Sequence, residues 1–165
     1  MRKLRDILNA CGGKLICGDP EAMVSDFVID SRRVKTNSAF VALKGENTDG
    51  NLYICDAAAA GASLCITGVN SRNNLPSGCA LMYCPDVVSA LGEIAAHYRR
   101  IERKTVVGVT GSVGKTTVRE LCGSVLSKKR RVCVPDGNFN NLLGLPLTLL
   151  KDDGAETAVV EAGIS

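Results

Sequence analysis

One short glycine-containing segment holds the residues of this sequence that are best suited to chemistry on phosphates. It reads Thr110-Gly111-Ser112-Val113-Gly114-Lys115-Thr116-Thr117, and it lies between an apolar run at 105–109 and a helical pattern. Glycines let the backbone approach a polyphosphate closely, and the N–H groups at a helix start point towards it. Lys115 offers a positive charge to the terminal phosphates, and the Thr116 hydroxyl can ligate Mg²⁺. The segment therefore predicts a nucleoside triphosphate site.

The segment departs from the usual phosphate-loop pattern at one position. Val109 stands where that pattern has its first glycine, five positions before Gly114. The alternative interpretation is an ordinary strand-to-helix turn that binds no phosphate. We favour the phosphate loop because Gly-Lys-Thr-Thr directly follows a β-branched strand.

Glu161 is a second chemical marker. It follows the apolar run Thr157-Ala158-Val159-Val160, which predicts a strand. Ligands of α/β sheets bind at the carboxyl ends of parallel strands. A carboxylate at that edge, beside a phosphate loop, can hold the Mg²⁺ that bridges the β- and γ-phosphates. The alternative is a surface glutamate at a strand end.

Short apolar runs alternate with helical patterns, and these define the elements that must position the two markers. We predict strands at 27–30, 39–43, 63–67, 105–109, 131–134 and 157–160, helices at 53–61, 87–103 and 115–127, and a polar loop at 70–78. Strands that alternate with helices imply an α/β fold with a parallel sheet. We expect a small mixed α/β domain at 1–84, a connecting helix at 85–104 and the start of a parallel-sheet domain at 105–165.

Composition excludes several classes of protein. The chain has 165 residues, a formal net charge of +3 and only six aromatic residues, three Phe and three Tyr, so it carries no nucleic-acid signature. No apolar run is long enough to span a bilayer, and no signal peptide is visible, so we expect a cytoplasmic protein without membrane insertion. The eight cysteines are scattered and predict free thiols. His97, the only histidine, is interpreted as a helix residue and not as a catalyst.

Several motifs together resemble the Mur ligases, a family of enzymes that build the peptidoglycan peptide. The similar segments are 30–32, 40–50, the loop 111–117 with Arg119-Glu120, 137–148 and 159–163. The resemblance extends over the whole chain. It implies that the N-terminal domain binds the uridine diphosphate end of a substrate and that the second domain, from 105, binds ATP.

The resemblance also implies which residues contact the substrate. In the N-terminal domain these are Ser31, Arg32, Lys44, Gly45, Asp49, Gly50 and Asn51, and in the second domain Asn140 and Asn141. A guanidinium such as that of Arg32 suits a diphosphate. The alternative is that these segments are ordinary exposed turns. Relatives usually carry His where this chain has Asn51, so the contact made by that His is in question here.

Segment 137–148 is most similar to one branch of the family. The implied activity is an ATP-dependent amide ligase that adds D-alanyl-D-alanine to UDP-N-acetylmuramoyl-tripeptide through an acyl phosphate. Lys115 and Glu161 are the implied catalytic residues, with Mg²⁺ held by Thr116 and Glu161. The alternatives are the branch that adds the third amino acid, a non-catalytic UDP-sugar or nucleotide-binding module, and an unrelated phosphate-loop kinase or GTPase.

Family members continue beyond the part of the domain that this chain carries. We therefore expect a partial ligase that is inactive by itself. We also expect the protein to be a monomer.

Overall fold

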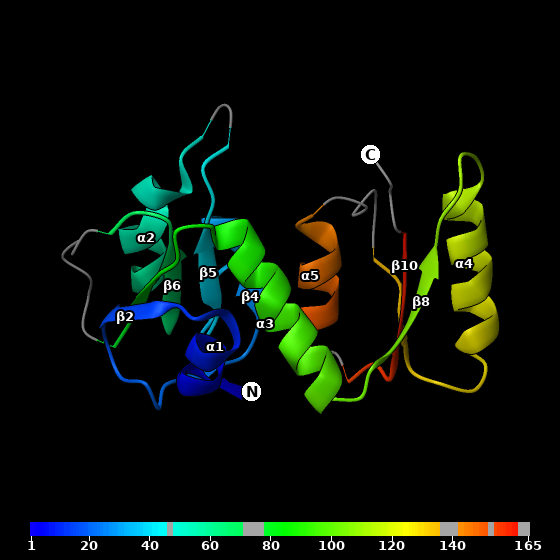
Figure 1. Cartoon of the computed structure of the whole chain (residues 1–165), viewed down its shortest axis with the longest axis horizontal. Helices are drawn as coiled ribbons and strands as arrows, with labels where there is room; N and C mark the ends of the chain where they lie inside the picture. The colour runs from blue at the N-terminus through cyan, green and yellow to red at the C-terminus, as the bar shows by residue number, and fades with distance from the viewer. Residues whose placement is uncertain (46–47, 71–77, 136–141, 152–153, 162–165) are drawn as a thin grey trace. The chain divides into compact units, whose positions relative to one another are not determined.

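The chain forms two compact units, residues 1–94 and 95–165, in the computed structural model (Figure 1). The structure describes residues 1–45, 48–70, 78–135, 142–151 and 154–161. Both units are built from strands and helices, which confirms the α/β prediction.

A five-stranded sheet organises the N-terminal unit. Its strands run in the order β2, β7, β6, β5, β4, with all neighbours parallel except β2 and β7. The strands are β2 (Lys14–Cys17), β4 (Phe27–Val28), β5 (Ala39–Ala42), β6 (Leu64–Thr67) and β7 (Ala80–Tyr83). Strands β5 and β6 are buried along their whole length. Side chains of a strand alternate between faces, so both faces of the sheet centre are covered.

Short helices complete the N-terminal unit. They are α1 (Leu4–Cys11), the 3-10 helices η1 (Ser31–Arg33) and η2 (Gly50–Tyr53), and α2 (Ile54–Ala59). Helix α2 packs on β5 and β6. The core between this helix and the sheet combines one large side chain, Phe40, with smaller apolar ones: Ala42, Ile54, Ala57, Ala58, Ala62, Cys65, Cys79 and Leu81. Alanines on α2 allow the helix to approach the sheet closely.

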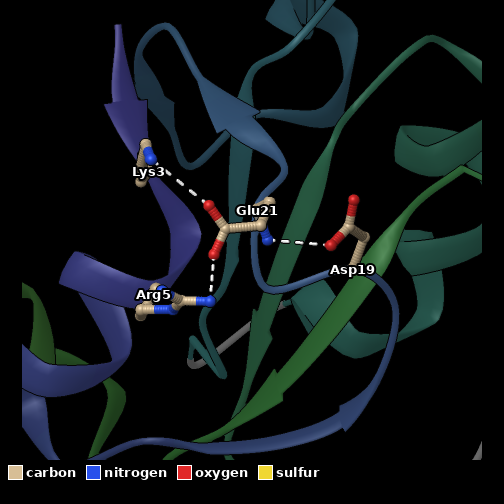
Figure 2. Close-up of polar contacts among 4 residues, drawn as sticks. All are labelled: Lys3, Arg5, Asp19 and Glu21. Carbon is tan, nitrogen blue, oxygen red and sulfur yellow. Dashed lines mark hydrogen bonds and ion pairs between the residues drawn. The ribbon is translucent and has the colours of Figure 1, made fainter.

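A two-stranded antiparallel ladder joins β1 (Arg2–Lys3) to β3 (Met23–Val24). Figure 2 shows the charged contacts beside it. The carboxylate of Glu21 accepts a bond from Lys3 Nζ at 3.2 Å and forms an ion pair with Arg5, while its N–H donates to Asp19 at 2.9 Å. These side chains are largely exposed, so the contacts align the segment without adding much stability.

Helix α3 (Val87–Ile101) contains the boundary between the two units, which falls after Ile94. Asp86 caps its start, since the carboxylate accepts a bond from the Ser89 N–H at 2.9 Å. Arg99 and Arg100 lie in its last turn, where positive charge complements the helix dipole.

The C-terminal unit has a parallel three-stranded sheet in the order β8, β10, β9. Its strands are β8 (Thr105–Val109), β9 (Val132–Cys133) and β10 (Thr157–Glu161), and its helices are α4 (Lys115–Leu126) and α5 (Gly144–Leu150). Figure 1 shows α4 and α5 on opposite sides of β8 and β10. The buried ammonium of Lys104 donates to the carbonyls of Leu149 and Lys151, which satisfies the C-terminal end of α5.

Most predicted elements are present with shifted ends, but two strands of the N-terminal sheet were not predicted. The strand pattern at 27–30 is shorter in the structure, and the helix expected at 53–61 divides into η2 and α2. Ala60 is the C-cap of α2, and Gly61 after it has a φ of 104°, which favours glycine. Strands β2 and β7 have no clear alternation of apolar and polar residues. Strand β2 is the edge strand and pairs with β7, which lies between β2 and β6 and pairs with both.

Candidate functional site

The predicted phosphate loop connects the end of β8 to the start of α4. Gly111 has a φ of 147° and Gly114 a φ of 78°, a region of backbone space that favours glycine. The left-handed Gly114 is the N-cap of α4, so it turns the chain directly into the helix. The ammonium of Lys115 folds back over the loop and donates to the Gly111 carbonyl at 2.7 Å. This hydrogen bond holds the Lys115 ammonium against the loop backbone.

The start of α4 presents unpaired helical donors to an exposed loop. The Val118 N–H donates to the Gly114 carbonyl at 3.0 Å, and the N–H groups before it precede the first hydrogen bond of the helix. Residues 110–114 and Thr116 are exposed, and the first turn contains no acidic residue. A helix start with free donors, a nearby ammonium and no carboxylate attracts anions. The local geometry therefore suits a phosphate group.

Glu161 lies at the same sheet edge as this loop. In the parallel pairing of β10 with β8, Glu161 is the partner of Val109, the residue that precedes the loop. The side chain is buried and forms an ion pair with the buried guanidinium of Arg119, with Oε1 at 3.1 Å from Nη1. The contact lacks hydrogen-bond geometry, and Oε1 has no hydrogen-bond partner among the described residues. A buried carboxylate oxygen in this position fits a divalent cation beside the phosphates of a nucleotide.

Arg119 is a functional candidate that sequence reasoning did not select. It lies one turn after Lys115 on α4, is buried, and also contacts Glu120 at 2.6 Å. Side chains four residues apart on a helix share a face, so the Lys115–Arg119 spacing was an available signal. The reason for the burial of Arg119 became visible only in the structure, where Glu161 at the end of β10 pairs with it.

The Asp30-Ser31-Arg32 segment forms a rigid turn in the N-terminal unit. The Asp30 carboxylate accepts bonds from the Arg32 backbone N–H at 3.0 Å and from Nε and Nη2 at 2.9 and 2.8 Å. These bonds from Arg32 hold the pKa of Asp30 at about 2. The Arg32 side chain is 87% exposed, so it is oriented by Asp30 and remains accessible to an anion. Ser31 begins the 3-10 helix beside it.

Residues 44–45 and 48–51 make a second group of ordered contacts in the same unit. Lys44 pairs with Asp49 in an isolated antiparallel bridge, and the Gly45 N–H donates to the Thr48 carbonyl at 2.9 Å. Gly50 is packed tightly, since a Cβ there would lie 2.8 Å from both the N and the O of Leu43. The backbone of Leu43 approaches Gly50 so closely that only glycine fits at this position.

Asn51 is held on two sides and does not point freely into solvent. Its backbone and side-chain N–H groups donate to Asp49 at 2.9 and 2.7 Å, and these bonds lower the pKa of the Asp49 carboxyl. Its Oδ1 accepts from the Thr67 hydroxyl at 2.6 Å, at the carboxyl end of β6. The amide thus links the turn to the sheet, a contact that no local pattern could predict.

The sequence-predicted site residues therefore form separate groups. Residues 110–117 and Glu161 lie at the same sheet edge of the C-terminal unit, while residues 30–32 and the described residues 44–45 and 48–51 lie in turns of the N-terminal unit. Asn140 and Asn141 lie outside the described residues. In the part of the chain that the structure describes, no cluster of three or more His, Cys, Asp or Glu side chains could hold a metal ion, and no helix has the length and apolar character to cross a membrane.

Two matched domains establish the family. A Mur ligase catalytic-domain model matches residues 24–99, and a Mur ligase middle-domain model matches residues 109–165, the segment with the loop and Glu161. The chain belongs to the Mur ligase family. Within it, the chain is 38% identical over 167 residues to the UDP-N-acetylmuramoyl-tripeptide–D-alanyl-D-alanine ligase of Haemophilus influenzae, covering 98% of this chain and 35% of that protein.

Solved structures give the same assignment. MurF from Acinetobacter baumannii matches with a TM-score of 0.84 and 31% identity over 98% of this chain and 36% of its own. MurF ligase from Thermotoga maritima, solved in complex with ADP, matches with a TM-score of 0.72 and 36% identity over 84% of this chain and 32% of its own. The chain therefore spans about a third of the length of these relatives.

Proposed function

We propose that this chain is part of an ATP-dependent amide ligase that joins D-alanyl-D-alanine to UDP-N-acetylmuramoyl-tripeptide. The observation that carries the proposal is the pairing of Glu161 with Val109, which sets a buried carboxylate beside the Lys115 loop. The names of the relatives supply the substrates. UDP-linked precursors and ATP are both cytoplasmic metabolites, so we place the protein in the cytoplasm.

The loop residues bind the nucleotide in this proposal. The N–H groups of residues 111–117 receive the phosphates, and the Lys115 ammonium exchanges the Gly111 carbonyl for a phosphate oxygen. Glu161 and the Thr116 hydroxyl would hold Mg²⁺, which neutralises charge on the β- and γ-phosphates when bound. The hydrogen-bonding capacity left on Glu161 Oε1 supports this role. Arg119 balances the Glu161 charge and positions the carboxylate.

The reaction needs electrostatic stabilisation and no protein nucleophile. The terminal carboxylate of the tripeptide attacks the γ-phosphorus of ATP, which gives an acyl phosphate and ADP. The amino group of D-alanyl-D-alanine then attacks the acyl carbon, and phosphate leaves as the amide forms. Lys115 stabilises the negative charge that spreads over the transferring group.

The N-terminal unit carries the proposed contacts to the UDP end of the substrate. The exposed Arg32 guanidinium, oriented by Asp30, suits the diphosphate of the UDP group. Ser31, together with the turn that contains Lys44, Gly45, Asp49, Gly50 and Asn51, offers hydroxyl, backbone and amide groups to a uracil or ribose. We retain Asn140 and Asn141 as substrate contacts within the same proposal.

Nucleotide binding is tested on the chain itself by calorimetry with ATP and Mg²⁺. We expect Lys115→Ala to weaken binding at least about tenfold, since a charge-assisted hydrogen bond contributes about 1.5–3 kcal/mol. Lys129→Ala is the matched control, because Lys129 is an exposed lysine just past the end of α4. Equal loss in both variants would reject a specific role for the loop lysine.

Ligase activity is tested as ADP release by a protein that contains this chain together with the remaining length of its relatives. The assay supplies ATP, Mg²⁺, UDP-N-acetylmuramoyl-tripeptide and D-alanyl-D-alanine, with a UDP-linked dipeptide and a diamino acid as the competing pair. Release that depends on D-alanyl-D-alanine supports the proposal. Release only with the competing pair assigns the protein to the branch that adds the third amino acid, and release with neither reduces it to a binding module.

A further inference from the structure

A hollow of about 210 Å³ on the N-terminal unit is lined by two thiols that the proposed ligase reaction does not use. Cys11 is the last residue of α1, and Cys84 lies between β7 and the start of α3. The carboxylates of Asp86 and Glu93 line the same hollow. The hollow lies within residues 1–94, so it is complete in one unit.

The backbone brings the two cysteines together. Gly12 ends α1 in a left-handed conformation with a φ of 63°, and the chain then enters β2. Strand β2 pairs with β7 so that Lys14 is opposite Tyr83, which sets Gly13 beside Cys84. A Cβ on Gly13 would lie 3.0 Å from Cys84 Sγ. The end of α1 therefore lies directly over the end of β7.

The two thiols differ in accessibility and in acidity. Cys84 is only 2% exposed, whereas Cys11 is half-buried and opens to the hollow. The hydrogen bond with the Cys84 thiol lowers the pKa of Cys11 to about 7, against burial and the Glu93 charge, which oppose ionisation. The same hydrogen bond raises the pKa of Cys84. The protonated Cys11 thiol donates to the Ile7 carbonyl at 3.2 Å. Because Cys11 opens to the hollow and Cys84 is buried, Cys11 is the thiol that a reagent in the hollow reaches first.

The chain also contains a second thiol pair that serves as an internal comparison. Cys65 and Cys79 have their sulfurs 3.7 Å apart, but both lie in the apolar core beneath α2. The hydrogen bond with Cys79 and burial raise the pKa of Cys65, and the same hydrogen bond lowers the pKa of Cys79. Proximity alone therefore does not distinguish the Cys11–Cys84 pair; access through the hollow does.

We propose that Cys11 and Cys84 form an oxidation site for hydroperoxides. The Cys11 thiolate attacks one peroxide oxygen, the O–O bond breaks, and hydrogen peroxide leaves hydroxide and a sulfenic acid on Cys11. The Cys84 sulfur then attacks the Cys11 sulfur, the S–O bond breaks, and water leaves with the Cys84 proton. The two thiols lose two electrons, the peroxide gains them, and a disulfide ties α1 to the start of α3.

The first test treats the purified chain with hydrogen peroxide, blocks remaining thiols with N-ethylmaleimide, and maps unreduced peptides by mass spectrometry. We expect one main linked peptide that contains Cys11 and Cys84. The buried pair Cys65 and Cys79 should remain as thiols. If Cys11 accumulates as sulfinic or sulfonic acid without a link to Cys84, or if peroxide links other cysteines equally fast, the proposal is wrong.

A matched pair of variants tests the role of Cys84 without a peroxide. At pH 7 a thiol with a pKa of about 7 is half ionised, against about 1% at the ordinary 9.0, a ratio of roughly 50. The lower nucleophilicity of the more acidic thiolate reduces this advantage to about sixfold. Alkylation of Cys11 should therefore slow about sixfold in Cys84→Ala.

Cys84→Ser separates hydrogen bonding from disulfide formation, because its hydroxyl can donate to Cys11 but cannot form the link. We expect Cys11 in this variant to alkylate within about twofold of the parent rate and to form no Cys84 link. Equal alkylation rates in the parent chain and Cys84→Ala would contradict the proposed activation of Cys11. The peptide map of the parent chain decides the matter even where a variant folds poorly.

Discussion

Replacement of Glu161 with glutamine should destabilise the C-terminal unit by about 3 kcal/mol, because breaking a buried ion pair costs about 3–5 kcal/mol. The side chains of Arg119 and Glu161 are 4% and 3% exposed and their charged atoms are 3.1 Å apart. At an effective dielectric constant of about 20, charges at this 3.1 Å separation attract by about 5 kcal/mol. Glutamine keeps the shape but leaves the arginine charge buried. Glu120 still contacts Arg119, so we expect the lower end of the range.

The same unit offers a matched control with different burial. Arg131 and Glu156 form an ion pair of similar length, 3.3 Å, but their side chains are 70% and 55% exposed. Exposed pairs contribute about 0–1 kcal/mol because water screens them. Glu156→Gln should therefore change stability by less than about 1 kcal/mol. The two substitutions remove the same charge, so their difference measures the effect of burial.

Hydrogen–deuterium exchange resolved by peptide is the suitable assay, because the chain has two units that need not unfold together. Protection of peptides from α4 and β10 should fall in Glu161→Gln and change little in Glu156→Gln. The double variant Arg119→Met, Glu161→Gln should recover much of the loss, since no unpaired charge remains. Equal effects of the two single substitutions, or additive losses in the double variant, would refute the reasoning.

Two further predictions concern the N-terminal unit. The pKa of Asp30 is about 2 in the folded chain, below its ordinary value of 3.8. The contribution of Asp30 to stability is therefore present above about pH 4 and is lost as the pH falls to about 2. An NMR titration of Asp30 should give a midpoint near pH 2, and Arg32→Gln should raise that midpoint. Gly50→Ala should cost about 1–3 kcal/mol, because a Cβ meets the Leu43 backbone at 2.8 Å. Gly92→Ala, in open space on α3, should instead stabilise by about 1 kcal/mol, and opposite shifts in thermal midpoint would verify both.

Local patterns predicted much of the fold because they depend on neighbouring residues. β-Branched runs predicted β8 and β10, and the glycines predicted the turn before α4. Strands β2 and β7 were missed, since their residues do not alternate and their stability comes from pairing. The hydrogen bond from the Thr67 hydroxyl to Asn51 was also missed, because it joins a turn to a strand sixteen residues away.

The sequence by itself determined the family, the phosphate-loop candidate and the class of chemistry, because loop, lysine and threonine are contiguous and need only a local turn. Tertiary structure decided which distant groups accompany them. Parallel pairing of β8 with β10 places Glu161 beside the loop, and α4 then buries Arg119 against it. The β2–β7 pairing likewise brings Cys11 to Cys84. Such contacts depend on strand register across the sheet, and the side chains of either segment alone do not encode it.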